Sequence, residues 1–180
     1  EWKTSTLTSQ RRFYDKHVAP IIKSGRTKAV VIVSDAMRYE IADELTSRIR
    51  NEDKFDAELS AVLGSLPSYT QLGMASLLPH KSLAITAEGD RALADGQRTD
   101  GTLNRSKVLE SVDGVALNAS KVFEMHRDEL RTLYSQHQVI YVFHDRIDAA
   151  GDDPTTEGTV FQAAEETLRE LVQMVKKLTN

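Results

Sequence analysis

The chain has 180 residues, of which 40% are hydrophobic, and this is enough for one domain with a buried core. Its net charge of −4 excludes a global basic field for nucleic acid, so any such contact would be local or come from other parts of a longer protein. Cysteine is absent and no apolar run approaches the roughly 20 residues that span a bilayer, so we expect a cytoplasmic protein without disulfides or membrane contact.

The first half of the chain alternates between helical and strand-like patterns. Residues 6–23 predict a covering helix that ends at a Ser-Gly pair. The β-branched run 28–34 is typical of a central parallel strand that is buried on both faces. An amphipathic helix follows over 41–49, and the alternating pattern of 55–63 predicts a second strand. A Ser-x-x-Gln capping box then predicts a short helix over 68–79.

The middle of the chain, residues 80–114, is polar and rich in Gly, Asp and Arg, and before residue 103 its pattern does not define a conformation. Beyond that point we expect a helix over 103–111, a short strand at 115–117 and a helix over 121–135. Residues 139–143 form a second strongly apolar strand. A final helix carries one apolar face, made by Val160, Ala164, Leu168, Leu171, Val172, Val175 and Leu178.

Alternating strands and helices predict an α/β domain with a doubly wound, mostly parallel sheet sandwiched by helices. We expect one domain over residues 1–180 without internal repeats. Its successive parts are the covering helix 1–27, the segment 28–79 with the first acid, the polar insert 80–120 and the second metal-loop segment 121–180.

Asp35 directly follows the first apolar strand and therefore stands at its carboxyl end. In open α/β sheets the ligand crevice lies outside these strand ends, where an acid is placed to hold a metal ion or a phosphate-bearing substrate. The alternative is that Asp35 caps the helix that follows, and its position alone favours neither interpretation.

Thr70 lies in the first turn of a predicted helix. A hydroxyl there gains from the helix macrodipole, which stabilises its alkoxide, and a bound metal would stabilise the alkoxide further. Thr70 is thus a candidate nucleophile. The alternative, which the residues alone favour, is an ordinary first-turn threonine with Ser68 as the helix cap.

Asp148 and Asp152 follow the second apolar strand and are four residues apart, with Gly151 between them. A bent loop at the glycine would turn both carboxylates inward, as ligands of a divalent metal. The alternative is a solvated acidic turn before Pro154.

Other motifs give weaker signals. His144 and Asp145 are similar to the His-Asp pair of helical metal-dependent phosphohydrolases, but those enzymes are all-helical and this pair follows a strand. Glycine-rich phosphate loops are missing, so the sequence does not support a nucleotide-cradling mechanism. Surface or packing roles are the default for the remaining histidines, His17, His80, His126 and His137.

The segments 30–40, 66–79 and 141–152 closely resemble the PglZ domain of the alkaline phosphatase superfamily, which takes part in bacterial phage defence of the BREX and phage-growth-limitation type. The resemblance spans most of the chain. It implies an alkaline-phosphatase-like fold, two divalent metal ions (Zn, Mn or Mg) and other phage-defence proteins as partners.

The resemblance also implies roles for four residues. Asp35 would bind one metal, and Thr70 would be the nucleophile that contacts the same metal. Asp148 would bind the second metal. Asp152 stands where superfamily members usually have a histidine, and an all-oxygen site would shift the preference from zinc toward magnesium or manganese.

The later Asp-His-Gly segment of the superfamily and its final histidine ligand do not occur in these 180 residues. The chain also begins at Glu1 without an initiator methionine and ends on a predicted helix. We therefore expect the N-terminal part of a domain that is incomplete at its C-terminal end. Such a fragment would bind metal weakly and have little or no phosphatase activity, with the two-metal site complete only in the full-length protein.

Two functions from different classes follow from these observations. The first is a metal-dependent phosphohydrolase or phosphodiesterase, with no residue that separates a phosphomonoester from a nucleic-acid phosphodiester as substrate. The second is a catalytically silent scaffold that keeps the phosphatase-like fold and docks other defence proteins. An apolar patch on the outer helices would favour docking.

Overall fold

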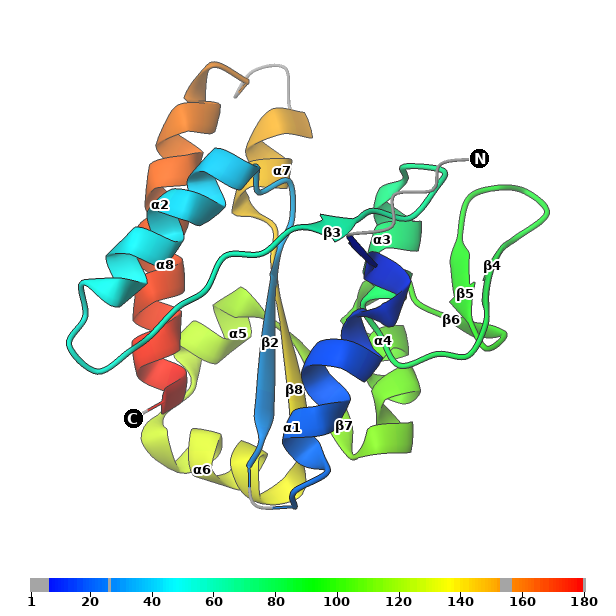
Figure 1. The fold of residues 1–180 in the computed structure, drawn as a ribbon, viewed down its shortest axis with the longest axis horizontal. Coiled ribbons are helices and arrows are strands. Elements are labelled where there is room, and N and C mark those ends of the chain that lie inside the picture. The colour runs from blue at the N-terminus through cyan, green and yellow to red at the C-terminus, as the bar shows by residue number, and fades with distance from the viewer. Residues whose placement is uncertain (1–6, 26, 153–156, 180) are drawn as a thin grey trace. The chain divides into compact units, whose positions relative to one another are not determined.

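The computed structural model describes residues 7–25, 27–152 and 157–179 (Figure 1). These residues form two compact units. The first unit comprises the described residues of Glu1–Val31, Ala61–Asn118 and His126–Val142. The second comprises those of Ile32–Ser60, Ala119–Met125 and Phe143–Asn180. The strands are β1 (Thr8–Ser9), β2 (Ala29–Ser34), β3 (Val62–Leu63), β4 (Leu83–Ile85), β5 (Ala92–Ala94), β6 (Gln97–Arg98), β7 (Gly114–Asn118) and β8 (Val139–His144).

The α-helices are α1 (Ala19–Ile22), α2 (Tyr39–Arg50), α3 (Thr70–Ser76), α4 (Gly101–Leu109), α5 (Ala119–Glu124), α6 (Arg127–Gln136), α7 (Arg146–Asp152) and α8 (Val160–Thr179). Short 3₁₀ helices occupy Gln10–Arg12, Glu110–Val112 and Glu157–Thr159, and a π-helix occupies Tyr14–Val18. The mixture of helices with parallel strand pairs confirms an α/β protein. In the ranges that the structure describes, no helix combines the length and apolar character that a bilayer crossing requires.

The main sheet has three strands in the order β2-β8-β7. In the first unit the Ala29 N–H donates to the Gln138 carbonyl at 3.0 Å, and in the second the Asp35 N–H donates to the His144 carbonyl at 2.8 Å. Both residue numbers rise together between these two bonds, so β2 and β8 run parallel. All six residues of β8 are buried, as its apolar run predicts.

The prediction that β2 is a central strand buried on both faces is wrong for the described residues. There β2 pairs with β8 alone, and after Ala29 every residue of β2 is only half-buried. An apolar run marks burial but does not say which of two such strands has neighbours on both sides. The central position belongs to β8.

The N-terminal segment of the first unit does not form the single covering helix predicted over 6–23. It begins with β1, continues through the 3₁₀ helix and the π-helix, and reaches a one-turn α1. The Gln10 side chain ties this segment to the rest of the unit, because it donates to the Gly73 carbonyl at 3.3 Å and accepts from the Ser65 N–H at 3.2 Å.

The predicted strand 55–63 is also wrong over most of its length. Only β3 is a strand, and it pairs in parallel with β1. Both residues of β3 are exposed, whereas Phe55, Ala57 and Leu59 are half-buried between exposed neighbours. The alternation therefore marks a partly covered face, but among the described residues only Val62 and Leu63 have the hydrogen-bonded partner that a strand requires.

The polar middle of the chain folds into an antiparallel meander, β4-β5-β6, in the first unit. The meander packs on α3, where Leu72, Ala75 and Ala92 form a buried cluster bordered by Tyr69 and Leu83. The helix expected over 103–111 is α4 with a 3₁₀ extension, and the strand expected at 115–117 is β7. The insert is therefore regular structure, which its polar composition concealed.

The single helix predicted over 121–135 is divided into α5 and α6. The break falls at His126, which has extended backbone angles and whose N–H donates to the Glu129 carboxylate at 2.7 Å. A glutamate three residues after the cap is the usual start signal of a new helix. This signal outweighs the helical periodicity across the break.

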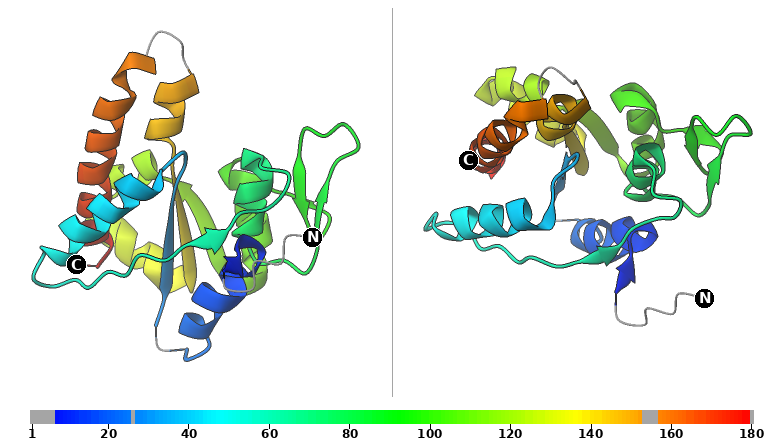
Figure 2. Two further views of the ribbon diagram at one scale, coloured as in Figure 1. Left: turned by 45° about the horizontal axis from the view of Figure 1, so that its top comes forward. Right: turned by 90° about the horizontal axis from the view of Figure 1, so that it is seen from above.

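The second unit is assembled on α8, which packs against α2 and α7 (Figure 2). Leu168, Leu171 and Leu178 are buried, as the predicted apolar face requires. The remaining buried positions are Ala163, Thr167 and Met174, which the predicted face did not include. The amphipathic pattern thus predicts the helix, but the elements packed against it determine how many of its residues are buried.

We expect Leu72→Ala to reduce the free energy of unfolding by about 2–5 kcal/mol, because Leu72 is 2% exposed and its loss leaves a cavity in the cluster beneath the meander. The same substitution at Leu103, which is 74% exposed on α4, should cost less than about 0.5 kcal/mol. Urea unfolding measures both values. Equal losses at the two positions would contradict the assigned core.

Asp95 organises the start of the meander. The Lys81 N–H donates to both oxygens of its carboxylate at 3.0 Å, and the Ser82 N–H donates to one of them at 2.7 Å. These bonds, from Lys81 first and then Ser82, hold the pKa of Asp95 below its ordinary value of 3.8. Because only the ionised form accepts these bonds fully, they are present above pH 3.8 and are lost as the pH falls through the lower, folded value.

We therefore expect Asp95→Asn to speed hydrogen exchange of the Lys81 and Ser82 amides at neutral pH, because an amide has only one acceptor oxygen. The unchanged protein should approach the exchange pattern of this variant as the pH is lowered below about 3.8. Exchange measured by mass spectrometry at several pH values, corrected for intrinsic rates, tests this. Slow exchange at both amides in the variant would show that Asp95 does not hold the turn.

Candidate functional site

Asp35 directly follows β2, lies in the second unit and is half-buried. Its N–H donates to the His144 carbonyl, and its carboxylate accepts from the Ala36 N–H at 2.9 Å. Ala36 has a φ of 57°, so the chain turns sharply after the acid. The helix-cap alternative for Asp35 is wrong, because the N-cap of α2 is Arg38.

Thr70 is the first residue of α3, in the first unit, and it is exposed. Tyr69 is the N-cap, with extended backbone angles and no side-chain cap bond. The predicted capping box and the role of Ser68 as cap are therefore wrong. The Tyr69 hydroxyl donates to the Asp90 carbonyl, which ties the start of α3 to the meander.

Asp148 lies in the first turn of α7, in the second unit, and is half-buried. The backbone of Asp152 closes the same helix, while its side chain lies outside the described part of the structure. Neither the predicted bent loop nor the acidic turn is formed up to this point, because Gly151 continues the helix. A spacing of four residues now places both positions on one helix face.

The structure brings Asp35 and the start of α7 to neighbouring strand ends. The backbone bond from Asp35 reaches His144, the last residue of β8, and α7 begins at Arg146. Thr70 belongs to the other unit. Within the described residues, no group of three or more histidine or acidic side chains is arranged to hold a metal ion.

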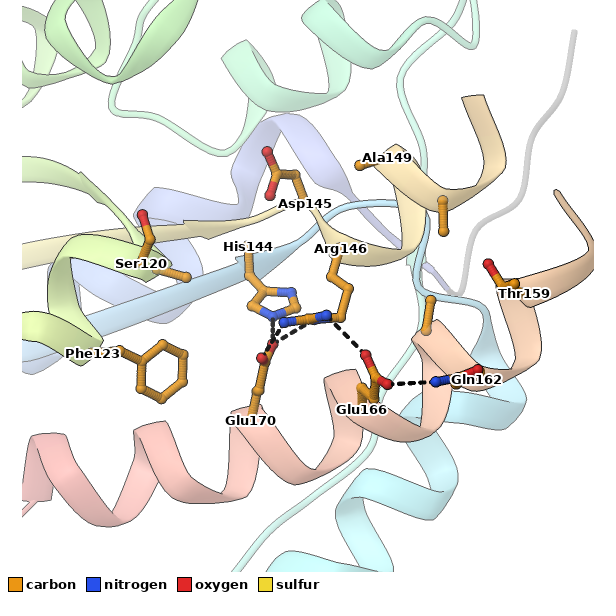
Figure 3. Close-up of a pocket in the computed structure, with 13 residues that line it drawn as sticks. Ser120, Phe123, His144, Asp145, Arg146, Ala149, Thr159, Gln162, Glu166 and Glu170 are labelled. Carbon is orange, nitrogen blue, oxygen red and sulfur yellow. Dashed lines mark hydrogen bonds and ion pairs between the residues drawn. The ribbon is translucent and has the colours of Figure 1, made fainter. Parts of the chain in front are cut away.

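A cluster of charged side chains lies beside these strand ends, and the sequence alone did not reveal it (Figure 3). His144 Nε2 donates to the Glu170 carboxylate at 2.7 Å, and Arg146 Nε donates to the same oxygen at 2.9 Å. Arg146 Nη2 donates to the other oxygen of the Glu170 carboxylate. Arg146 Nη1 donates to Glu166 at 2.8 Å, and Gln162 Nε2 donates to Glu166 at 2.9 Å.

The cluster keeps Glu170 ionised. Burial raises the pKa of Glu170. The hydrogen bonds from Arg146 and His144 together lower it by more, so the pKa lies below its usual value. The hydrogen bond to Glu170 in turn raises the pKa of Arg146. The two charges therefore stabilise one another over the physiological pH range.

An open pocket of about 590 Å³ adjoins the cluster, entirely within the second unit (Figure 3). Its walls come from α5, α7 and α8. His144 lines the pocket although its side chain is only 3% exposed, and its Nδ1 is a buried nitrogen without a hydrogen-bond partner among the described residues. The other lining residues include Ser120, Phe123, Asp145, Ala149, Thr159 and Ala163.

The sequence held one signal of this cluster, the spacing of four residues between Glu166 and Glu170 on the final helix. Such a pair shares one face and suits a single arginine as partner. The sequence does not show that the arginine comes from α7. The similarity of His144-Asp145 to a metal-binding His-Asp pair does not hold, because His144 contacts Glu170 and Asp145 is exposed.

Comparison with known proteins gives a consistent result. The model of the BREX system PglZ alkaline phosphatase-like domain matches residues 13–180. The alkaline phosphatase-like protein BrxZ of Escherichia coli O9:H4 (strain HS) is 41% identical over 99% of this chain and 21% of its own length. The alkaline phosphatase-like protein PglZ of Bacillus cereus (strain H3081.97) is 37% identical over the same shares. The chain spans about a fifth of the length of these curated relatives. It belongs to the family of BREX system PglZ alkaline phosphatase-like domains.

Proposed function

We propose that this chain carries part of the active site of a metal-dependent phosphohydrolase or phosphodiesterase in a BREX-type phage-defence system. Membership of an alkaline phosphatase-like family supports the reaction class. The observation that carries the proposal is the 2.8 Å bond from the Asp35 N–H to the His144 carbonyl, because it sets one strand-end acid beside the start of the helix that contains Asp148. Paired acids at neighbouring strand ends suit divalent cations.

The donor set fits a hard divalent cation. Asp35 and Thr70 would hold one ion and Asp148 the second, with Asp152 where superfamily members usually have a histidine. Carboxylate and hydroxyl oxygens without any imidazole favour magnesium or manganese over zinc. When bound, the ions would favour the ionised hydroxyl and neutralise the charge that develops on the phosphoryl oxygens.

In this proposal Thr70 Oγ attacks phosphorus and forms a Thr70–phosphate ester, while the bond from phosphorus to the leaving oxygen breaks and that oxygen takes up a proton. Water then hydrolyses the ester and restores the hydroxyl. Because Thr70 begins a helix and is exposed, its hydroxyl is accessible to a substrate. The Asp-His-Gly segment implied by the resemblance is absent from these 180 residues, so we propose that they hydrolyse little on their own.

A second candidate function is a catalytically silent scaffold that docks other proteins of the defence system. Two large apolar side chains in the second unit favour it: Tyr39 on α2 is 64% exposed and Phe161 on α8 is 91% exposed. Exposed aromatic side chains are frequent anchors of protein interfaces. Nucleic acid is a further candidate partner of the intact protein, although the net charge of −4 gives it no general attraction.

We expect Asp35→Ala to weaken Mn²⁺ binding by more than about tenfold in the intact protein, since even the loss of a ligand's hydrogen-bond partner typically costs 10–100-fold. Asp43→Ala, which removes an exposed acid from α2, is the matched control and should bind Mn²⁺ like the unchanged protein. Isothermal calorimetry with Mn²⁺ and Zn²⁺ measures the affinities and tests the metal preference. Equal affinities for both variants would remove Asp35 from the site.

We expect Thr70→Ala to reduce phosphodiester hydrolysis by the intact protein to the background rate, because it removes the attacking hydroxyl. Thr102→Ala removes the same group from the first turn of another helix, α4, and should retain full activity. A chromogenic phosphodiester with Mn²⁺ present provides the assay. Metal-dependent turnover that survives in the Thr70 variant would exclude Thr70 as nucleophile, and no turnover by the unchanged protein would favour the scaffold.

A further inference from the structure

Glu170 binds the end of β8 and the beginning of α7 at the same time. One of its oxygens accepts from His144 Nε2 at 2.7 Å and from Arg146 Nε at 2.9 Å, and the other accepts from Arg146 Nη2. His144 is the last residue of the strand and Arg146 is the first residue of the helix. One carboxylate on α8 therefore fixes both sides of the turn between them (Figure 3).

Arg146 is held in a single orientation. Its Nε and Nη2 are bound by Glu170, and its Nη1 is bound by Glu166, one turn earlier on α8. Gln162 in turn holds the second oxygen of Glu166. A planar guanidinium with all three nitrogens bound fixes direction as well as distance, and charge-assisted bonds of this kind are about twice as strong as neutral ones.

The helix α7 is too short to be stable without contacts to other elements. α7 has seven residues, and isolated helices shorter than roughly 12 residues are marginal in water. Its direction must come from tertiary contacts, which include the buried Ile147 and the bonds of Arg146 to α8. Asp148 follows Arg146 by two residues in the same helical turn. The bonds of Arg146 therefore help to set where the first turn of α7, and with it Asp148, lies.

The same turn is tied to Asp35. The backbone carbonyl of His144 accepts from the Asp35 N–H, while the His144 side chain donates to Glu170. His144 is buried, so it has little freedom to move independently of either partner. The chain of contacts from Glu170 thus reaches Asp35 and the first turn of α7, which contains Asp148.

We propose that Glu170 is a positioning residue, which holds the turn between β8 and α7 so that Asp35 and Asp148 keep the spacing that divalent metal binding needs. The inference rests on the proposed function, because it takes Asp148 and Asp35 as metal ligands. Glu170 affects metal binding through Arg146 and His144 and takes no part in the bond-making steps.

The chain offers a matched control on the same helix. Glu165 also accepts hydrogen bonds from three nitrogens, since Arg48 Nη1 and Nη2 donate at 3.0 and 2.8 Å and Arg169 Nε donates at 3.1 Å. Its bonds tie α8 to α2 and not to α7. Glu165→Gln and Glu170→Gln therefore remove comparable charged contacts from α8, but only the second loosens α7.

The test measures Mn²⁺ affinity by calorimetry and thermal unfolding of the metal-free protein, both on the intact protein. Glu170→Gln should weaken Mn²⁺ binding by roughly 10–100-fold, the usual effect of losing a partner outside the metal shell. Glu165→Gln should bind Mn²⁺ with unchanged affinity, even if its unfolding temperature falls by as much as that of Glu170→Gln. Equal loss of affinity in both variants would mean general destabilisation and would overturn the proposal.

Further variants keep the two proposals separable. If Asp148→Ala leaves Mn²⁺ affinity unchanged, the proposed metal site itself fails. If Asp148→Ala abolishes binding while Glu170→Gln does not change it, only the positioning role fails. Should Glu170→Gln not fold, Glu166→Gln removes a single contact of Arg146, and weaker Mn²⁺ binding at an unchanged unfolding temperature would support the role. Unchanged binding in that variant would overturn it.

Discussion

The parallel pairing of β2 with β8 is the constraint on which the proposed site depends. Where the two strands end, the Asp35 N–H donates to the His144 carbonyl at 2.8 Å. Backbone pairing fixes strand ends to within the spacing of neighbouring strands, whatever the side chains are. An acid that ends one strand and a helix that follows the other are thereby brought together by main-chain bonds. This pairing does not depend on which side chains stand at the strand ends.

The helix α8 provides the second half of this arrangement through acidic side chains on two of its faces. Glu165 binds Arg48 of α2, while Glu166 and Glu170 bind Arg146 of α7. Burial of apolar surface is itself non-directional, so it constrains the rotation of a short helix less than hydrogen-bonded ion pairs do. Bidentate arginine–carboxylate pairs have a defined geometry. The use of ionic anchors on both partners explains how a seven-residue helix can be held in one orientation.

In the first unit, hydrogen bonds between polar groups stabilise the meander β4-β5-β6, which has few large apolar residues. The Asp95 carboxylate satisfies the N–H groups of Lys81 and Ser82, and the buried Thr99 hydroxyl donates to the Ala92 carbonyl at 2.8 Å. The Tyr69 hydroxyl connects the meander to the start of α3. Thr70 follows Tyr69 directly, so this hydrogen bond also holds the exposed first turn of α3 against the meander. Low hydrophobicity did not prevent a fixed structure here.

The sequence by itself determined the strong elements and the family. The apolar run of β8 and the amphipathic pattern of α8 are long enough to specify a strand and a helix in any setting, because burial of their apolar side chains dominates. Motif resemblance likewise pointed to the family that residues 13–180 match. Local patterns failed where a short segment depends on partners elsewhere, as in the N-terminal helix and the strand predicted over 55–63.

Only the tertiary structure decided which apolar strand is central, where the helix over 121–135 breaks, and that Asp148 lies on a helix instead of a bent loop. The same holds for the partnership of Arg146 with Glu166 and Glu170, which are about twenty residues away in sequence. Sequence spacing records which residues share a face of one element. It does not record which face of another element they meet, because that is set by packing of the whole unit.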